Sequence, residues 1–486
     1  MSSESFARRS RVSLAEILSA LSYALDITEG QPAGHCVRSC WIGIHIGRAI
    51  GLRDDMLWAL YYTLLLKDLG CSSNAARICE LYLTDDRSFK HDFKLVDGGL
   101  ASALDFVFRH TGLNAGMSGR LRAVANIMRN GSQIADELIA TRCHRGADIA
   151  RQLRFPESVA HGIHGLDEHW DGSGRPDRLQ GETIPLAARI ALLAQVVDVF
   201  HTSAGRDAAV AEVRRRAGGW FDPALASTFE AIARDDAFWE GLSAPDINTR
   251  ILAFEPAHGQ VDVDDDYLDE IAAAFGKVVD AKSPFTSGHS ARVAQYADAL
   301  GAPLGIAPAR RRWLWRGALL HDIGKLGVSN AILDKPGKLD DDEWVAMRRH
   351  ATHSHEILSR ISVFGDMASI AAAHHERIDG GGYPLGLRDD QISRETRIIT
   401  IADFFDALTA DRPYRGAMPV EKALAIIGSE VGRAVDADVY EALLSIVYDA
   451  QQGHADEPVR TGTGSPSTTG IAREARKPVA ATPADG

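Results

Sequence analysis

The sequence predicts an all-α protein built from two related helical halves. Most of its 486 residues fall into segments in which apolar side chains recur at three- and four-residue spacing, the period of an amphipathic helix. The alternating patterns typical of β-strands are scarce. Several short motifs occur twice in the same order, and a chain of this length exceeds one compact core. We therefore expect two domains of one kind.

The two copies align first through a pair of motifs near the start of each half. SGHSARV at 287–293 resembles AGHCVRS at 33–39, and LLHDIGK at 319–325 matches LLKDLGC at 65–71. Both pairs are 254 residues apart. A shared offset between separate motifs indicates a tandem duplication.

Two later motifs keep the order but change the offset. DGGGYP at 379–384 matches DGSGRP at 171–176, and TRI at 396–398 matches ARI at 188–190, both 208 residues apart. The first copy therefore holds about 46 additional residues between its matched blocks, and LYLTDDRSFKHDFKLVDGG lies among them.

The repeat and the composition predict the domain boundaries. The first domain covers 1–245, and a linker rich in Pro, Gly and acidic residues covers 246–264. The second domain covers 265–451. Residues 452–486 contain few apolar side chains, so we expect a disordered tail.

The overall composition narrows the function classes. The net charge of -13 argues against binding to a nucleic-acid polymer, which needs an extended basic face. The apolar runs are too short or too interrupted to span a bilayer, and the first residues lack the apolar stretch of a signal peptide. The five cysteines match no zinc template and are expected to be buried thiols. We expect a cytoplasmic protein.

The second copy gathers side chains that bind divalent metals through nitrogen and oxygen. A single histidine is more often a core residue than a ligand, and His353 and His355 are expected at the surface. The remaining set is larger than one ion needs and suits two ions bridged by a carboxylate. A shared site would also satisfy all of these polar groups together. The expected ligands are His289, His321, Asp322, His350, His374, His375 and Asp403.

These residues lie in motifs that resemble a known family. HDIGK at 321–325 resembles the metal motif of the HD phosphohydrolase superfamily, and HHERIDGGGYP at 374–384 resembles the signature of its HD-GYP branch. KPGKL at 335–339 and DALTADRPYR at 406–415 also resemble that branch. The resemblance covers about 265–450. It implies two tandem HD-type helical bundles when both copies are counted, and hydrolysis of cyclic di-GMP to pGpG or GMP in bacterial second-messenger signalling.

The resemblance also assigns roles to residues. It places the family's metal ligands on the seven residues above, with iron or manganese as the metal and Asp322 as the bridging, catalytic carboxylate. Phe285 stands where trinuclear members have a glutamate, so two ions are expected. Ser354 replaces a usual glycine, a change expected to matter little. The catalytic residues implied are Asp322 and Lys325, and the substrate-binding residues are Lys325, Tyr383, Arg412 and Arg415. For the two arginines, an ordinary solvated pair is the alternative interpretation.

The first copy has lost this ligand set. Only His35 and Asp68 keep metal-binding character at the aligned positions. The other five ligand positions hold Lys67, Arg142, Leu166, Asp167 and Gln195. Two ligands cannot hold two ions, and cations at ligand positions repel metal. We expect a regulatory or dimerising domain, with a homodimer as one assembly it would support.

Two alternatives to a cyclic di-GMP phosphodiesterase stay open at this point. The second half could hydrolyse another cyclic dinucleotide. It could also act as an interaction module that docks a diguanylate cyclase or an adaptor protein through its GYP surface. The complete ligand set favours an enzyme.

Overall fold

Helices form the regular secondary structure throughout the part of the chain that is described. The computed structural model describes residues 13–96, 100–113, 116–256, 263–411 and 415–455. No β-strand occurs within these ranges. The predicted all-α class is therefore confirmed.

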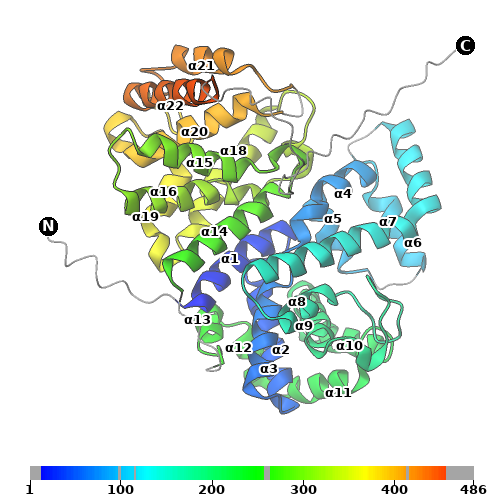
Figure 1. Ribbon diagram of the computed structural model, residues 1–486. Helices are drawn as coiled ribbons and strands as arrows, with labels where there is room; N and C mark the ends of the chain where they lie inside the picture. Colours follow the sequence, from blue (N-terminus) through cyan, green and yellow to red (C-terminus); the bar gives the residue numbers. More distant parts are fainter. Residues whose placement is uncertain (1–12, 97–99, 114–115, 257–262, 412–414, 456–486) are drawn as a thin grey trace, which may run out of the picture. The chain divides into compact units, whose positions relative to one another are not determined.

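The two halves follow one another along the chain (Figure 1). The helices described in the first half are α1 (Leu14–Thr28), α2 (His35–Ala49), α3 (Asp54–Leu66), α4 (Ala75–Tyr82), α5 (Asp86–Phe93), α6 (Leu100–His110), α7 (Met117–Gln152), α8 (Glu157–His164), α9 (Leu186–Ala204), α10 (Arg206–Arg216), α11 (Pro223–Ile232), α12 (Asp236–Leu242) and α13 (Ile247–Leu252). Those of the second half are α14 (Asp265–Asp280), α15 (His289–Gly301), α16 (Pro308–Leu320), α17 (Asn330–Leu333), α18 (Asp341–Leu358), α19 (Gly365–Ala373), α20 (Arg394–Thr409), α21 (Val420–Ser429) and α22 (Ala437–Ala455).

The duplicated motifs fold in the same way in both halves. Helix α2 begins at His35 and α15 begins at His289, each after a glycine in the left-handed conformation. The φ angles of Gly34 and Gly288 are 87° and 68°, which a residue with a Cβ adopts only at a cost. Helix α2 packs against α3 and α9, while α15 packs against α16 and α20. The same three-helix core therefore surrounds both copies of the site.

The additional residues of the first copy lie in a small helical unit between α3 and the middle of α7. We call residues 72–141 the additional segment; it stands where the second copy has the shorter stretch 326–349. Its helices α4 to α6 and the first part of α7 share a satellite core around Ile78, Phe89 and Phe106. This core gives the segment a fixed structure on the outside of the first copy's main core.

The predicted domain boundaries are only partly visible in the fold. The described residues up to Leu444 form one compact unit, and those from Ser445 on belong to a second. The expected linker at 246–264 contains α13, whose Ile251 is buried, and its residues 257–262 lie outside the described ranges. Helix α22 includes the first four residues of the expected tail, and 456–486 lie outside the described ranges. The division into domains stays a prediction.

Helix α9 is the described helix that is long and apolar enough to cross a membrane by length and composition. Of its most apolar 18-residue stretch, 61% is buried inside the protein. It occupies the central position that α20 has in the second half, which accounts for its apolar character.

Candidate metal centre and active site

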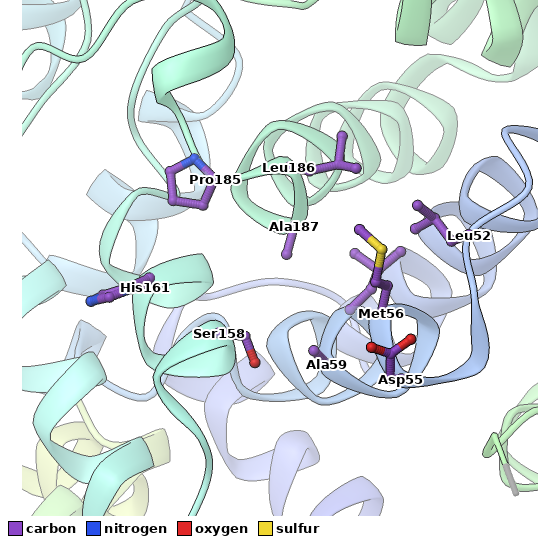
Figure 2. A pocket seen from close by; sticks show the side chains of 10 residues that line it. Leu52, Asp55, Met56, Ala59, Ser158, His161, Pro185, Leu186 and Ala187 are labelled. Carbon is purple, nitrogen blue, oxygen red and sulfur yellow. The ribbon is translucent and has the colours of Figure 1, made fainter. Parts of the chain in front are cut away.

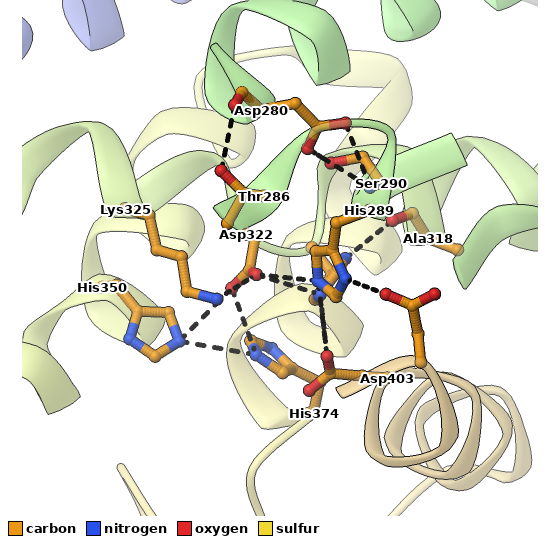
Figure 3. Close-up of polar contacts among 12 residues, drawn as sticks. Asp280, Thr286, His289, Ser290, Ala318, Asp322, Lys325, His350, His374 and Asp403 are labelled. Atoms are coloured by element: carbon orange, nitrogen blue, oxygen red, sulfur yellow. Dashed lines mark hydrogen bonds and ion pairs between the residues drawn. The ribbon is translucent and has the colours of Figure 1, made fainter. Parts of the chain in front are cut away.

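Seven side chains from five helices and their ends meet in the second half. Figure 3 shows His289, Asp322, His350, His374 and Asp403 pointing toward one another. Helix α15 supplies its first residue, α16 and α19 supply residues at their C-terminal ends, and α18 and α20 supply residues within the helix. These are the predicted ligands His289, His321, Asp322, His350, His374, His375 and Asp403. All are buried except His375 and Asp403, which are half-buried. The structure thus brings the whole predicted set together.

Asp322 lies at the centre and faces two pairs of histidines. Its Oδ2 atom is 3.4 Å from Nε2 of His289 and 3.3 Å from Nε2 of His321. Its Oδ1 atom is 3.6 Å from Nε2 of His350 and 3.7 Å from Nε2 of His374. A carboxylate whose two oxygens face separate nitrogen pairs has the geometry needed to bridge two ions.

The ligand atoms form overlapping groups that share Asp322. In one group they come from Asp322, His350, His374 and His375, and in another from His289, His321 and Asp322. A third group joins His321 and His374 to Asp403. Within each group the ligand atoms lie within 4.8 Å of one another, which is close enough for one ion to contact them all.

Hydrogen bonds that Nδ1 donates to backbone carbonyls turn the Nε2 atoms of three histidines toward Asp322. His321 donates from Nδ1 to the carbonyl of Ala318 at 2.7 Å, and His350 donates to that of Met347 at 2.6 Å. His374 makes the same bond to the carbonyl three residues before it. Partners of this kind fix the ring and the tautomer of metal-binding histidines.

The site fits a pair of metal ions. Nε2 of His289, Nε2 of His321 and Oδ1 of Asp322 are buried and have no hydrogen-bond partner among the described residues. Each unsatisfied buried group costs about 1–3 kcal/mol. Imidazole nitrogen and carboxylate oxygen are ligands for divalent transition metals, so bound ions would satisfy these groups together.

Burial keeps most of the histidines in the form that binds metal. Burial lowers the pKa of His350 to about 4 and that of His374 to about 3, and it lowers the pKa of His375 well below its usual value. Burial would raise the pKa of Asp322, but Lys325 and His321 hold it well below its ordinary range. His350, His374 and His375 are therefore neutral, and Asp322 is ionised, at neutral pH.

The sequence analysis did not identify the residues that hold the ligands in place. These are Asp406, Arg292 and Ser354. Asp406 accepts a hydrogen bond from Nδ1 of His289 at 2.7 Å and another from Nε of Arg292 at 2.6 Å. Ser354 donates to the carbonyl of His321 and accepts from the backbone N–H of Gly324. Ser354 therefore joins α18 to the HD motif, and the expectation that a serine at this position matters little stays a prediction.

The supporting role of Asp406 could have been predicted from the repeat, because the first half keeps the same three residue types. His35, Arg38 and Asp198 make the same arrangement in the first half, with Nδ1 of His35 2.7 Å from Asp198. The pair is thus kept where the metal ligands are lost, which marks it as a support for α2 and α15 rather than a ligand.

Of the predicted catalytic and substrate-binding residues, Lys325 and Tyr383 lie beside the metal ligands, whereas Arg415 does not contact them. Lys325 forms an ion pair with Asp322, and the ring of Tyr383 lies 4.8 Å from that of His375. Arg415 donates instead to backbone carbonyls, including that of Leu408 at 3.0 Å, so it braces the end of α20. Arg412 lies outside the described residues.

A cavity of about 770 Å³ adjoins the ligands. His350, His375 and Asp403 contribute to its wall. Beyond these ligands the wall includes Lys325, Lys335, Lys338, Trp344, Met347 and Tyr383. The cavity therefore combines metal ligands, positive charge and aromatic surface, which suits an anionic ligand with flat rings.

In the first half, two lysines pair with the carboxylates around the position of the lost site, and one of them, Lys67, is aligned with the ligand His321. Lys67 is buried and forms an ion pair with Asp68. Lys94 lies 2.9 Å from Glu29 and 4.0 Å from Asp68. The oxygens of Glu29 and Asp68, with Cys71, are close enough to hold an ion, but the two ammonium groups already neutralise them. The predicted loss of the metal site in this half agrees with this arrangement.

The first half has a cavity of a different kind (Figure 2). It measures about 280 Å³ and lies between α3, α8 and the start of α9, with Met56, Leu186 and Ala187 among its lining residues. None of the positions aligned with the metal ligands lines it. It therefore does not replace the lost site.

Comparison with known proteins agrees with this arrangement. The profile of the HD domain family matches residues 122–225 and 274–439, and so reaches both halves. The 3'3'-cGAMP-specific phosphodiesterase 3 of Vibrio cholerae is 54% identical over 430 residues, which cover 88% of this chain and 94% of that protein. The cyclic di-GMP phosphodiesterase response regulator RpfG of Xanthomonas campestris is 37% identical over 179 residues, 36% of this chain and 47% of RpfG.

A solved structure is also similar. The crystal structure of the cyclic GMP-AMP specific phosphodiesterase V-cGAP3 of V. cholerae superposes with a TM-score of 0.63 at 48% identity and covers 90% of this chain and 98% of that one. The likeness extends over both halves and not only over the ligand set. The chain belongs to the HD domain family, and its second half is of the HD-GYP type found in cyclic-dinucleotide phosphodiesterases.

Proposed function

We propose that the second half hydrolyses 3'3'-cGAMP, a cyclic dinucleotide with one guanine and one adenine. The resemblance to the HD-GYP branch led us to expect cyclic di-GMP. The relative matched over 94% of its length is specific for 3'3'-cGAMP, whereas RpfG is matched over less than half of its own length. Metal ligands act on the phosphodiester that all cyclic dinucleotides share, so they do not distinguish the bases. The match beyond the ligands supports 3'3'-cGAMP.

The observation that carries the proposed reaction is the position of Asp322 between two pairs of histidine nitrogens. The seven ligands would hold two divalent ions, with iron or manganese proposed from the family resemblance. Such ions supply Lewis acidity and an activated water for attack on a phosphodiester. Phe285 occupies the position of an additional ligand in trinuclear members, which supports two ions rather than three.

The chain's own residues would bind and orient the substrate. Lys325 contacts Asp322 at the wall of the cavity, where its ammonium can shift to a phosphoryl oxygen as negative charge grows there. Lys338 adds positive charge for a ligand with two phosphates, and Lys335 lines the same cavity in an ion pair with Glu343. Tyr383 and Trp344 offer rings on which purines can stack.

The expectations on partner docking, cellular compartment and dimerisation form part of the same proposal. The complete ligand set and the adjoining cavity support hydrolysis over a role limited to docking a diguanylate cyclase or an adaptor. The cytoplasm is the compartment in which a second messenger would be degraded. Homodimerisation through the first half stays a prediction.

The test compares substrates on one preparation. The purified full chain is loaded anaerobically with Fe²⁺ or Mn²⁺ and given 3'3'-cGAMP or cyclic di-GMP in separate reactions, with linear products separated by chromatography. We expect kcat/KM to be at least about tenfold higher for 3'3'-cGAMP, a difference of about 1.4 kcal/mol in transition-state binding. An equal or higher value for cyclic di-GMP would overturn the substrate, and hydrolysis of neither would overturn the reaction.

A further inference from the structure

A buried carboxylate of the first half contacts the second half next to the active site. Asp86 is the first residue of α5, in the additional segment, and is fully buried. Its Oδ1 atom accepts a hydrogen bond from the backbone N–H of Asn330 at 2.9 Å. Its Oδ2 atom lies 3.5 Å from Nζ of Lys282 and 3.7 Å from Nζ of Lys90. Two of these partners belong to the second half.

The next residue makes a second contact of the same kind. Arg87 donates from Nη1 to the carbonyl of Gly327 at 2.7 Å. Its Nε donates to the carbonyl of Ile27, at the end of α1, at 3.1 Å. One guanidinium therefore joins α1 to the second half. Helix α1 also packs against the 3₁₀ helix Ile323–Gly327 and against α18.

Both contacts act on the backbone that follows Lys325. We call residues 326–330 the post-HD segment. Lys282 donates from Nζ to the carbonyl of Leu326 at 3.2 Å, and Asn330 donates from Nδ2 to the carbonyl of Lys282 at 2.6 Å. Three backbone groups of the post-HD segment are therefore hydrogen-bonded to side chains: the carbonyls of residues 326 and 327 and the N–H of residue 330. Asp86 and Arg87 make two of these three contacts.

The post-HD segment is connected to the metal ligands through Lys325. The backbone N–H of Lys325 donates to the carbonyl of Asp322 at 2.8 Å, and Val328 donates to the carbonyl of Lys325 at 3.0 Å. A shift of the segment would therefore move the lysine that pairs with the central carboxylate. Displacements of about 1 Å can lower turnover on the order of 10²-fold.

We propose that Asp86 and Arg87 are positioning residues for the active site of the second half. They hold the post-HD segment so that Lys325 stays against Asp322. The additional segment of the first copy thus supplies, from outside the HD-type core, a support that the catalytic half lacks on its own. The inference rests on the proposed function, because turnover is one of its readouts.

The charges at the contact agree with this role. Lys282 is buried, and Asp86 is its ion-pair partner within 4 Å among the described residues. A buried ammonium that loses its carboxylate is strongly destabilised. Replacing Asp86 therefore changes the environment of Lys282, and with it the hydrogen bond from Lys282 to the post-HD segment.

The experiment uses the full chain and three variants that remove or replace one side chain. Arg87→Met removes the donor to Gly327, Arg87→Lys keeps a cation of similar reach, and Asp86→Asn removes the charge facing Lys282. Arg77→Met is the matched control, because Arg77 is half-buried on α4 and pairs with Glu80 and Glu137 of the first half. Each protein is assayed for kcat, KM and bound metal with 3'3'-cGAMP.

We expect Arg87→Met and Asp86→Asn to lower kcat at least about tenfold, with KM within about threefold and metal content unchanged. Arg87→Lys should recover most of the loss, and Arg77→Met should stay within twofold of the native chain. Values of kcat within twofold of native in both Arg87→Met and Asp86→Asn would overturn the proposal. Loss of turnover in proportion to loss of metal would overturn it as well, since it would reveal a general structural role.

Amide hydrogen exchange supplies a readout that does not depend on turnover. In Arg87→Met, exchange should become at least about tenfold faster at the amides of Leu326 to Asn330 and stay unchanged in α20. Faster exchange across α20 too, or unchanged exchange in the post-HD segment, would overturn the positioning role. If the native chain hydrolyses neither cyclic dinucleotide, the proposed function fails. The exchange rates would still show whether Arg87 holds the post-HD segment in place.

Discussion

The Nδ1 atoms of His35 and His289 each lie 2.7 Å from a buried aspartate, yet the pKa values of the two rings are shifted in opposite directions. Burial and Lys67 lower the pKa of His35 to about 4, despite the hydrogen bond to Asp198. Burial also disfavours the charged form of His289, but its contacts with Asp322 and Asp406 raise its pKa to about 9. Both halves thus keep the hydrogen bond between this histidine and an aspartate. They differ in the charged groups that face the other side of the ring, which are Lys67 in the first half and Asp322 in the second.

The shift at His35 predicts a loss of stability in acid. The unfolded chain takes up a proton near pH 6.5, whereas the folded His35 does so only near pH 4, so the free energy of unfolding falls as the pH drops through this window. At pH 5 the loss is about 2 kcal/mol relative to pH 7.5. His35→Gln keeps a donor for Asp198 and lacks the titration. Urea unfolding at both pH values should show the advantage of the native chain over this variant shrinking by that amount at pH 5. An advantage independent of pH would contradict the assigned shift.

The ligand groups predict a graded loss of metal. The native chain should bind about two divalent ions, and His350→Ala should keep about one because the group of His289, His321 and Asp322 is unchanged. Asp322→Ala should lose both, since this carboxylate belongs to both groups. His355→Ala is the control, as His355 is exposed on the same helix as His350. Metal analysis after anaerobic loading gives the counts. Two ions retained in Asp322→Ala would exclude a bridging role.

The position of Lys325 predicts a change in turnover without a change in metal content. Lys325→Met should lower kcat on the order of 10²-fold, because it removes a cation beside the reacting phosphodiester. The seven ligands remain, so bound metal should stay near the native level. Lys422→Met, which changes an exposed lysine on α21, should leave kcat within twofold. Equal losses of metal and turnover in Lys325→Met would show that Lys325 supports the ligands rather than the substrate.

Much of the fold and the ligand set was predictable because both depend on local patterns. Apolar periodicity marked the helices, and the ligands lie at helix ends or single helix positions, where a short motif fixes their place. The repeat also revealed which half had lost its site. His321 and Asp322, for example, meet the other ligands because α16 packs as α3 does in the first copy.

The residues that the sequence did not reveal act through long-range contacts. Asp86 contacts Asn330, 244 positions away, and Arg87 contacts Gly327, 240 positions away. Most of the additional segment has no counterpart in the second copy to compare with. Arg415 lay in a family-like motif but binds backbone carbonyls at the end of α20. The identity of the substrate depends on cavity walls whose residues come from several loops and helices, so the motifs did not specify it.

The most direct test of a single working centre in the second half is the rate of 3'3'-cGAMP hydrolysis by two aligned variants of the full chain. Asp322→Asn removes the central carboxylate charge in the second half, and Asp68→Asn makes the same change at the aligned position of the first half. With metal supplied in excess, we predict that Asp322→Asn lowers kcat by more than about 10³-fold, while Asp68→Asn stays within about threefold of the native chain. Substantial turnover in Asp322→Asn, or loss of turnover only in Asp68→Asn, would contradict the account.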